Sequence, residues 1–143
     1  MTSPTKIFTQ VILSERDEGD GMYQSHSDFM ESSNIKPSEE CWCMCIRMIM
    51  SILSKIPLEK ISSEMSPTLF QSLMGKYKDS WDSQEFIFEI EDRLQIMFTP
   101  SEISSFPNFF PVFGKSEVKN TGEWVNKIIY KWLPTTNHRV LRW

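Results

Sequence analysis

The chain has 143 residues, 40% of them hydrophobic, and its 19 acidic and 15 basic residues give a net charge of −4. The length favours one domain with its own core, and the excess of acid argues against nucleic-acid binding, which draws on clustered Lys and Arg. The apolar residues come in short groups, without the roughly 20 consecutive apolar residues that cross a membrane, and the start does not resemble a secretory signal. We therefore expect a cytoplasmic protein without membrane contact.

Residues 1–37 are rich in Ser, Thr, Asp, Glu and Gly. After the apolar run from Ile7 to Leu13 they show no sustained apolar period. A run this short cannot be assigned to a strand or a helix from periodicity, and the composition is typical of chain without a packed core. We expect a flexible N-terminal segment over residues 1–37.

A first helix is predicted over about residues 39–55. Ser38 can cap its start, and the two glutamates that follow suit the positive end of a helix. Pro57 is expected to end it. The apolar residues that recur at three- and four-residue spacing are Trp42, Cys45, Ile46, Ile49, Ile52, Leu53 and Ile56. This spacing predicts an amphipathic helix with one buried face.

The three cysteines, Cys41, Cys43 and Cys45, fall within five residues of this helix. They are too close together to staple distant parts of a fold as disulfides. A helix places Cys43 on the far side from the other two, and no further cluster of Cys or His completes a four-ligand metal site. We expect reduced structural thiols and no metal.

Residues 57–78 contain two prolines and a glycine and are expected to form a long packed loop. Whether this loop includes a short helix is not decided by the sequence. A second helix is predicted from Asp79 or Ser80, either of which can cap it, to about Met97. At about 100° per residue, one face of this helix is apolar. Its members are Phe86, Ile87, Ile90, Leu94 and Met97.

The opposite face of the second helix combines aromatic and acidic residues. Residues 79–95 hold six acidic residues and one basic residue. Aromatic side chains among charges are common at protein interfaces, where the aromatics supply affinity and the charges steer approach. We expect a docking surface for a partner with a basic surface, made of Trp81, Asp82, Glu85, Phe88, Glu89 and Asp92. The alternatives are an ordinary solvated acidic face, and aromatics that pack under a loop.

A short helical turn is expected from Thr99 through Phe106, because Thr caps well and Pro is tolerated at the first helical position. Residues 107–119 are expected to form a loop. A last helix is predicted to begin with Thr121 as its cap and to end before Pro134. Its buried stripe comprises Trp124, Val125, Ile128, Ile129 and Trp132.

This order of helix, long loop, helix, short helical turn and helix resembles that of the acyl carrier proteins. The element Asp79-Ser80-Trp81-Asp82 resembles the family's Asp-Ser-Leu-Asp, with Trp81 in place of the leucine. Residues 56–61 resemble the entry into the family's long loop, and residues 120–125 resemble the cap of its last helix. The likeness covers about residues 38–133, and residues 107–119 look like an insertion.

The resemblance implies an all-α fold, an acyl-carrier-like four-helix bundle with a long first loop over residues 38–133. Residues 134–143 are expected to form a loose basic tail. In the family the serine of this element carries 4′-phosphopantetheine, and the resemblance assigns that role to Ser80. A cap without modification is the competing role for Ser80.

We find no pair of residues that could act as catalytic acid, base or nucleophile. His26 falls in the expected flexible segment and His138 in the expected tail, so neither is placed to serve as a base. We therefore expect no enzyme but a monomeric carrier that presents a phosphopantetheine-bound group to partner enzymes. The alternative is an acidic helical binding protein without a prosthetic group, such as an inhibitor or immunity protein that faces a basic toxin.

Overall fold

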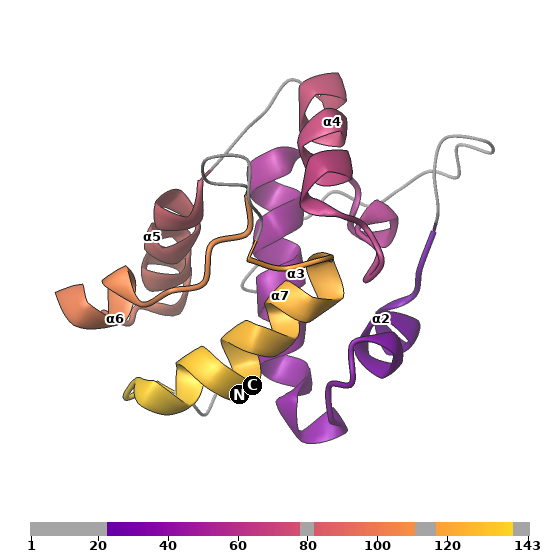
Figure 1. The fold of residues 1–143 in the computed structure, drawn as a ribbon. Coiled ribbons are helices and arrows are strands. Elements are labelled where there is room, and N and C mark those ends of the chain that lie inside the picture. Colours follow the sequence, from indigo (N-terminus) through magenta and orange to yellow (C-terminus); the bar gives the residue numbers. More distant parts are fainter. Residues whose placement is uncertain (1–22, 78–81, 111–116, 139–143) are drawn as a thin grey trace.

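The computed structural model describes residues 23–77, 82–110 and 117–138, and the regular elements in these ranges are helical (Figure 1). The prediction of a mainly helical protein is therefore confirmed. The α-helices are α2 (His26–Ser32), α3 (Glu40–Ser54), α4 (Pro67–Tyr77), α5 (Ser83–Leu94), α6 (Pro100–Ser104) and α7 (Thr121–Lys127), which continues as a π-helix over Ile128–Trp132. Short 3-10 turns cover Pro37–Glu39, Leu58–Lys60 and Leu133–Thr135. In the described ranges no helix is long and apolar enough to cross a membrane.

The helix α3 lies at the centre, with α2 on one side, α5 and α6 on the other, and α7 crossing in front (Figure 1). Its bounds agree with the predicted helix, although Ser38 lies in the preceding 3-10 turn and is not its cap. The prediction of a single buried face was too narrow. The buried residues of α3 are Trp42, Cys43, Cys45, Ile46, Arg47, Met48, Ile49, Met50, Ser51 and Ser54. Neighbouring elements thus cover this helix on almost every side.

Part of the segment expected to be flexible is folded. Ser25 caps α2 by accepting a hydrogen bond from the amide of Asp28 at 3.1 Å, and Phe29 and Ile35 are buried. The side chain of Asn126 donates to the carbonyl of Ser33 at 2.9 Å and so ties the end of α2 to α7. The signals for this fold were weak in the sequence because only a few apolar residues of this segment are buried. Residues 1–22, with the run from 7 to 13, lie outside the described residues.

The long loop expected over residues 57–78 contains the eleven-residue helix α4. Pro67 is its first residue, a position where the missing amide of proline costs no hydrogen bond. Phe70 and Met74 are buried on one side of α4. The spacing of these two residues is typical of a helix. The two prolines and the glycine nevertheless favoured a loop in the prediction from sequence.

The helix α5 is shorter than predicted at both ends. Asp82 caps it by accepting a hydrogen bond from the amide of Glu85 at 2.8 Å, so the described helix begins after Asp79 and Ser80. It ends at Leu94, because Gln95 takes the left-handed conformation at φ 54°. Phe86, Ile87 and Ile90 are buried as predicted. Met97, which was assigned to the same face, lies beyond the helix and is 80% exposed.

The last helix begins one residue earlier than predicted. Its cap is Asn120, which accepts from the amide of Glu123 at 2.8 Å. Thr121 is instead buried, and its hydroxyl donates to the carbonyl of Met65 at 3.0 Å. The next residue must be small, because a Cβ on Gly122 would lie 2.5 Å from the hydroxyl oxygen of Ser33. The start of α7 is therefore pressed against both the end of α2 and the chain near residue 63.

Aromatic rings fill the space between α5, α7 and the chain that follows α6. Trp124 is fully buried, with its ring centroid 5.1 Å from that of Phe86, 5.9 Å from that of Phe106 and 4.9 Å from that of Phe109. Its indole N–H donates to the carbonyl of Pro107 at 3.0 Å. The start of the region expected to be an inserted loop therefore forms part of the core.

The first residues of the expected loose tail are also packed. Thr136 is buried, and the ring of His138 lies edge-on to Phe98 with the centroids 5.3 Å apart. A ring nitrogen of His138 is 2.9 Å from the carbonyl oxygen of Met97. The prediction of a loose tail was therefore wrong for residues 134–138, and residues 139–143 lie outside the described ranges.

Candidate functional site

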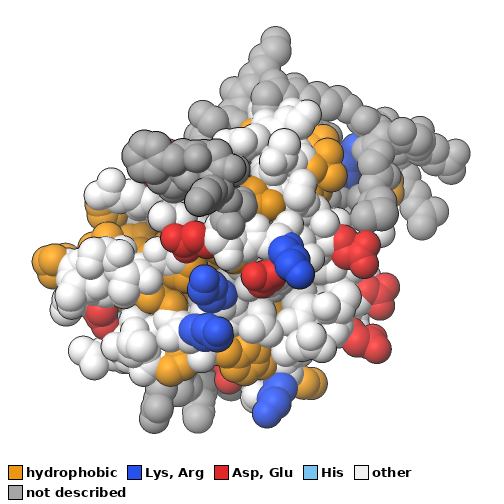
Figure 2. All heavy atoms as spheres, in the orientation of Figure 1, with side chains coloured by type: hydrophobic (Ala, Val, Ile, Leu, Met, Phe, Trp, Pro, Cys, Tyr) orange, Lys and Arg blue, Asp and Glu red, His pale blue; other side chains and the backbone are white. Residues whose placement is uncertain are grey.

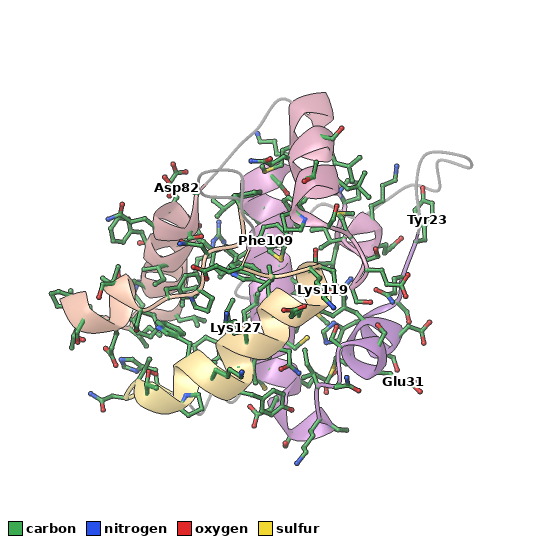
Figure 3. The ribbon with its side chains drawn as sticks, viewed as in Figure 1. Tyr23, Glu31, Asp82, Phe109, Lys119 and Lys127 are labelled. Carbon is green, nitrogen blue, oxygen red and sulfur yellow. The ribbon has the colours of Figure 1, made fainter. Side chains whose placement is uncertain are left out.

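The predicted docking surface is described for α5 and its cap. Asp82, Glu85 and Asp92 are exposed, Glu89 is partly buried, and the ring of Phe88 is 48% exposed. Figure 3 shows Asp82 pointing away from the body of the protein at the start of α5. The two remaining residues of the predicted site, Ser80 and Trp81, lie outside the described residues.

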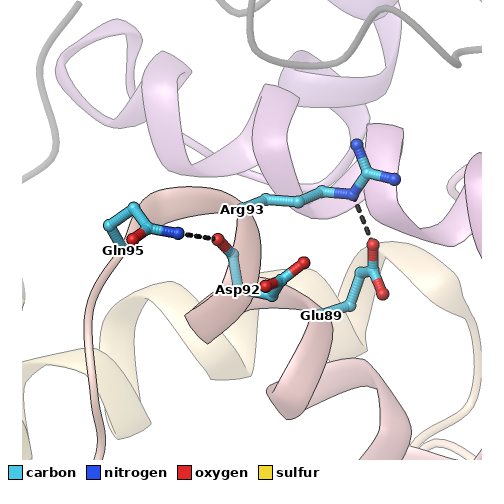
Figure 4. Close-up of polar contacts among 4 residues, drawn as sticks. All are labelled: Glu89, Asp92, Arg93 and Gln95. Atoms are coloured by element: carbon cyan, nitrogen blue, oxygen red, sulfur yellow. Dashed lines mark hydrogen bonds and ion pairs between the residues drawn. The ribbon is translucent and has the colours of Figure 1, made fainter.

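Local hydrogen bonds fix several acidic groups of α5. The carboxylate of Glu89 pairs with the guanidinium of Arg93 one turn later (Figure 4). The backbone carbonyl of Asp92 accepts from the side chain of Gln95 at 2.6 Å, and the carboxylate of Glu91 accepts from the amide of Phe98 at 2.8 Å. These contacts hold the turn that joins α5 to α6. The carboxylates of Glu85 and Asp92 are left on the exposed surface on either side of Phe88.

A groove of about 480 Å³ opens beside the first turn of α5, between this helix and α6. Ser83 and Gln84 line it from α5, and Asn108 adds a third polar side chain. Pro100, Ile103, Ser104 and Phe106 form the other side. The capping box at Thr99, in which Thr99 and Glu102 exchange hydrogen bonds, fixes the start of α6 and hence this wall of the groove. The groove can therefore take a ligand that has both amide and methylene groups.

A second arrangement joins α2 to the centre of α3. Arg47 is almost fully buried, and its guanidinium lies 4.4 Å from the ring centroid of Phe29. It approaches His26 Nδ1 at 3.0 Å and donates to the carbonyls of Leu58 and Ile61 at 3.2 and 3.1 Å. A guanidinium has donors only, so Nδ1 is the acceptor and the proton of the neutral imidazole is on Nε2.

The charge states of this pair follow from its burial. Burial first, and then the positive charge of Arg47, lowers the pKa of His26 to about 4. Burial also lowers the pKa of Arg47 to about 10. At neutral pH the imidazole is therefore neutral and the guanidinium is charged. His26 had been placed in a flexible segment; it is instead an anchor between α2 and α3.

Two of the three cysteines of α3 have thiols that are less acidic than usual. Cys43 and Cys45 are buried, and burial raises the pKa of each thiol to about 12. Cys41 is partly exposed. Among the residues that the structure describes, no group of three or more His, Cys, Asp or Glu could hold a metal ion. Thiols with raised pKa are poor nucleophiles because little thiolate forms at neutral pH.

Sequence reasoning missed the pairing of Arg47 with His26. A signal was present, because Arg47 is the only charged residue between Glu40 and Lys55, in an otherwise apolar helix. A buried cation of this kind needs acceptors, and those are supplied by a distant residue and by two backbone carbonyls. Only the fold could identify them.

Comparisons of the chain with protein-family models, with curated proteins and with solved structures find no match.

Proposed function

We propose that this chain is a carrier-type protein without catalytic activity of its own, in which Ser80 accepts 4′-phosphopantetheine and presents the attached group to partner enzymes. With α2 and α4 set aside, the order of α3, α5, α6 and α7 is similar to the helix order of acyl carrier proteins. The single observation that carries the proposal is the groove of mixed polar and apolar lining at the first turn of α5.

Ser80 is close in the sequence to a residue of that groove. Ser80 stands three residues before Ser83, which lines the groove. Three residues span at most about 10 Å even when extended. The amides of a pantetheine arm match the polar side chains of Gln84 and Asn108, and its methylene groups match the apolar wall at Ile103.

The attachment is a group transfer from coenzyme A that a transferase catalyses. The hydroxyl oxygen of Ser80 forms a bond to the phosphorus that carries the pantetheine. The bond from that phosphorus to the bridging oxygen breaks, adenosine 3′,5′-bisphosphate leaves, and a base of the transferase takes the hydroxyl proton. The chain itself supplies only the hydroxyl and the docking surface.

The exposed side of α5 supports recognition by partner enzymes. Phe88 offers an apolar anchor, and Glu85 and Asp92 lie one turn before and after it. Aromatic anchors contribute much of the affinity at interfaces, and charges around them speed association with a partner of opposite charge. A basic partner surface fits this arrangement.

The direct test is the intact mass of the full chain after co-expression with a phosphopantetheinyl transferase. We expect the mass to increase by one phosphopantetheine in the wild type and in a Ser83→Ala control, and not in Ser80→Ala. Because Ser83 is also a serine near the start of α5, the pair separates specific modification from nonspecific labelling. A wild-type chain that stays unmodified would contradict the proposal.

A second candidate is an acidic binding protein without a prosthetic group, such as an inhibitor or immunity protein that faces a basic toxin. The exposure of Phe88 among acidic residues favours it, since that surface needs no arm in order to bind. The two functions differ in their dependence on Ser80. If Ser80→Ala still protected cells from the toxin and Phe88→Ala did not, the second candidate, a binding protein without a prosthetic group, would be favoured.

A further inference from the structure

We propose that the groove between α2 and α3 binds a peptide segment of a partner protein that carries apolar side chains and a basic residue. The groove has an apolar floor, an acidic rim and a hydrogen-bond donor at His26 that has no partner among the described residues. It would form a docking surface separate from α5 and independent of Ser80.

The floor of the groove is apolar and adaptable. The groove measures about 580 Å³, and Met30, Ile35, Pro37 and Met44 line it. Met30 and Ile35 are buried and Met44 is partly buried, so the floor is firmly attached to the core. Methionine side chains are flexible and polarizable, and for this reason they suit surfaces that accept apolar side chains of differing shape.

The rim carries negative charge. Glu31 from α2 and Glu40 from α3 both line the groove, and both are exposed. Neither Lys nor Arg is among the described residues that line it. Figure 2 shows acidic side chains along the edge that α2 forms, whereas basic side chains lie over α7. An occupant with a Lys or Arg side chain would meet complementary charge at this rim.

The third feature is the ring of His26, which lines the same groove. Because Nδ1 accepts from Arg47, the neutral ring carries its proton on Nε2. That nitrogen is buried and makes no hydrogen bond to any residue that the structure describes. A buried donor without an acceptor is costly, and a backbone carbonyl of a bound peptide would satisfy it.

These three features together select the occupant. A second copy of this chain carries the same net charge of −4, which opposes self-association through an acidic rim. A purely apolar small molecule would leave Glu31 and Glu40 without a counterpart. A peptide supplies apolar side chains, a cation and carbonyl acceptors in one segment.

The arrangement also places the groove away from α5. Glu31 and Asp82 point outward on opposite sides of the molecule (Figure 3), and α3 lies between α2 and α5 (Figure 1). One chain could therefore contact two partners at once, and the groove would act as a tether while α5 engages an enzyme.

The test follows methyl resonances of the full chain labelled with ¹³C at the methionine methyl groups. The probe is a synthetic amphipathic peptide of Leu and Lys residues, and its counterpart has Glu in place of each Lys. We expect the Lys peptide to shift the resonances of Met30 and Met44 and to leave that of Met97 unchanged. Met97 is 80% exposed but lies after α5, so it is the matched control for nonspecific contact. The Glu peptide should shift none of them.

Two double variants with the same change of charge localise the site. Glu31→Lys with Glu40→Lys should weaken binding, measured from the Met30 and Met44 shifts, by at least tenfold. Glu85→Lys with Asp92→Lys should change it less than twofold. Equal loss in both variants, or no shift at Met30 and Met44, would overturn the proposal.

Two other occupants of the groove would give different results, and either result would overturn the proposal of a partner peptide. Shifts at Met30 and Met44 that grow with protein concentration alone would assign the groove to a second copy. Shifts caused by Phe8→Asp without peptide would assign it to the chain's own N-terminal run. Because no readout uses Ser80, failure of the proposed modification leaves this test unaffected.

Discussion

The helices α3 and α5 are of similar length, 15 and 12 residues, but they serve different purposes. α3 is covered on almost every side, and several of its buried polar groups are hydrogen-bonded: Ser51 donates to the carbonyl of Ile56 at 2.7 Å, and Arg47 reaches two carbonyls and an imidazole. α5 buries one face and leaves Phe88 and its acidic neighbours in solvent. The contrast teaches that an apolar residue in α3 maintains the fold, whereas an exposed apolar residue in α5 is available for recognition.

The largest expected effect comes from two phenylalanines of α5 that differ in burial. Phe86 is fully buried against Trp124, and Phe88 is 48% exposed. Phe86→Ala should lower the free energy of unfolding by about 3–5 kcal/mol, because a large cavity opens in the aromatic cluster. Phe88→Ala should change it by less than about 0.5 kcal/mol. Urea unfolding followed by circular dichroism measures both changes. Equal losses of unfolding free energy in the two variants would contradict the assignment of one buried and one exposed face to α5.

The sequence indicated this division of α5 but not the complete cover of α3. Helical spacing alone placed Phe86 inside and Phe88 outside, because one face of α5 is apolar and the other charged. In α3 the residues outside the expected stripe include the apolar Cys43, Met48 and Met50, so spacing could not show how many neighbours pack around the helix. α2 supplies one of those neighbours, and its burial depends on long-range contacts such as that of His26 with Arg47.

The candidate site could be predicted only in part, because sequence spacing indicates the faces of one helix but not its contacts with distant segments. The acidic and aromatic side of α5 follows from local periodicity, so its residues could be named in advance. The two grooves each combine residues from two or more elements, and no sequence spacing brings Met30 next to Met44 or Ser83 next to Ile103. The end of α5 was misplaced because Gln95 adopts a left-handed conformation that its residue type does not demand.

The next effect concerns the close packing of the start of α7 against the end of α2 and against Ser63. Gly122→Ala should lower the free energy of unfolding by about 1–3 kcal/mol, because the new methyl group would overlap the hydroxyl of Ser33 and crowd Ser63. The double variant with Ser33→Gly removes that hydroxyl and should recover part of the loss. Thermal unfolding of the single and double variants measures the coupling. Full additivity of the two changes would mean that this contact is not tight.

The burial of His26 beside the positive charge of Arg47 should make stability depend on pH. The pKa of His26 is about 4 in the folded protein and 6.5 as its ordinary value, so the unfolded chain binds the proton more readily. This contribution is complete above pH 6.5 and is lost progressively as the pH falls toward 4. Allowing for partial exposure, it amounts to about 1–2 kcal/mol. Urea unfolding between pH 7 and 5 should show the loss, and His26→Asn should flatten it; an unchanged slope would contradict the role of His26.

The smallest effect is expected on the exposed side of α5. Glu89→Gln removes the charge that pairs with Arg93 one turn away. Helix pairs at this spacing contribute about 0.3–0.5 kcal/mol, and salt screens this pair incompletely because both side chains are partly buried. The difference in unfolding free energy should therefore be near the limit of measurement and should become smaller in 1 M salt. A loss of more than about 1 kcal/mol would show that this side of α5 is structural.

The central claim, that Ser80 and the exposed side of α5 form one working surface, is tested most directly by the initial rate at which a phosphopantetheinyl transferase loads the chain from coenzyme A. Intact mass over time would be compared for the wild type, Phe88→Ala, Glu85→Lys and the control Glu31→Lys, which makes the same charge change on α2. We predict loading of the wild type and the control at equal rates and loading of the two α5 variants several-fold more slowly. A wild type that is not loaded, or α5 variants that load as fast as the control, would contradict the account.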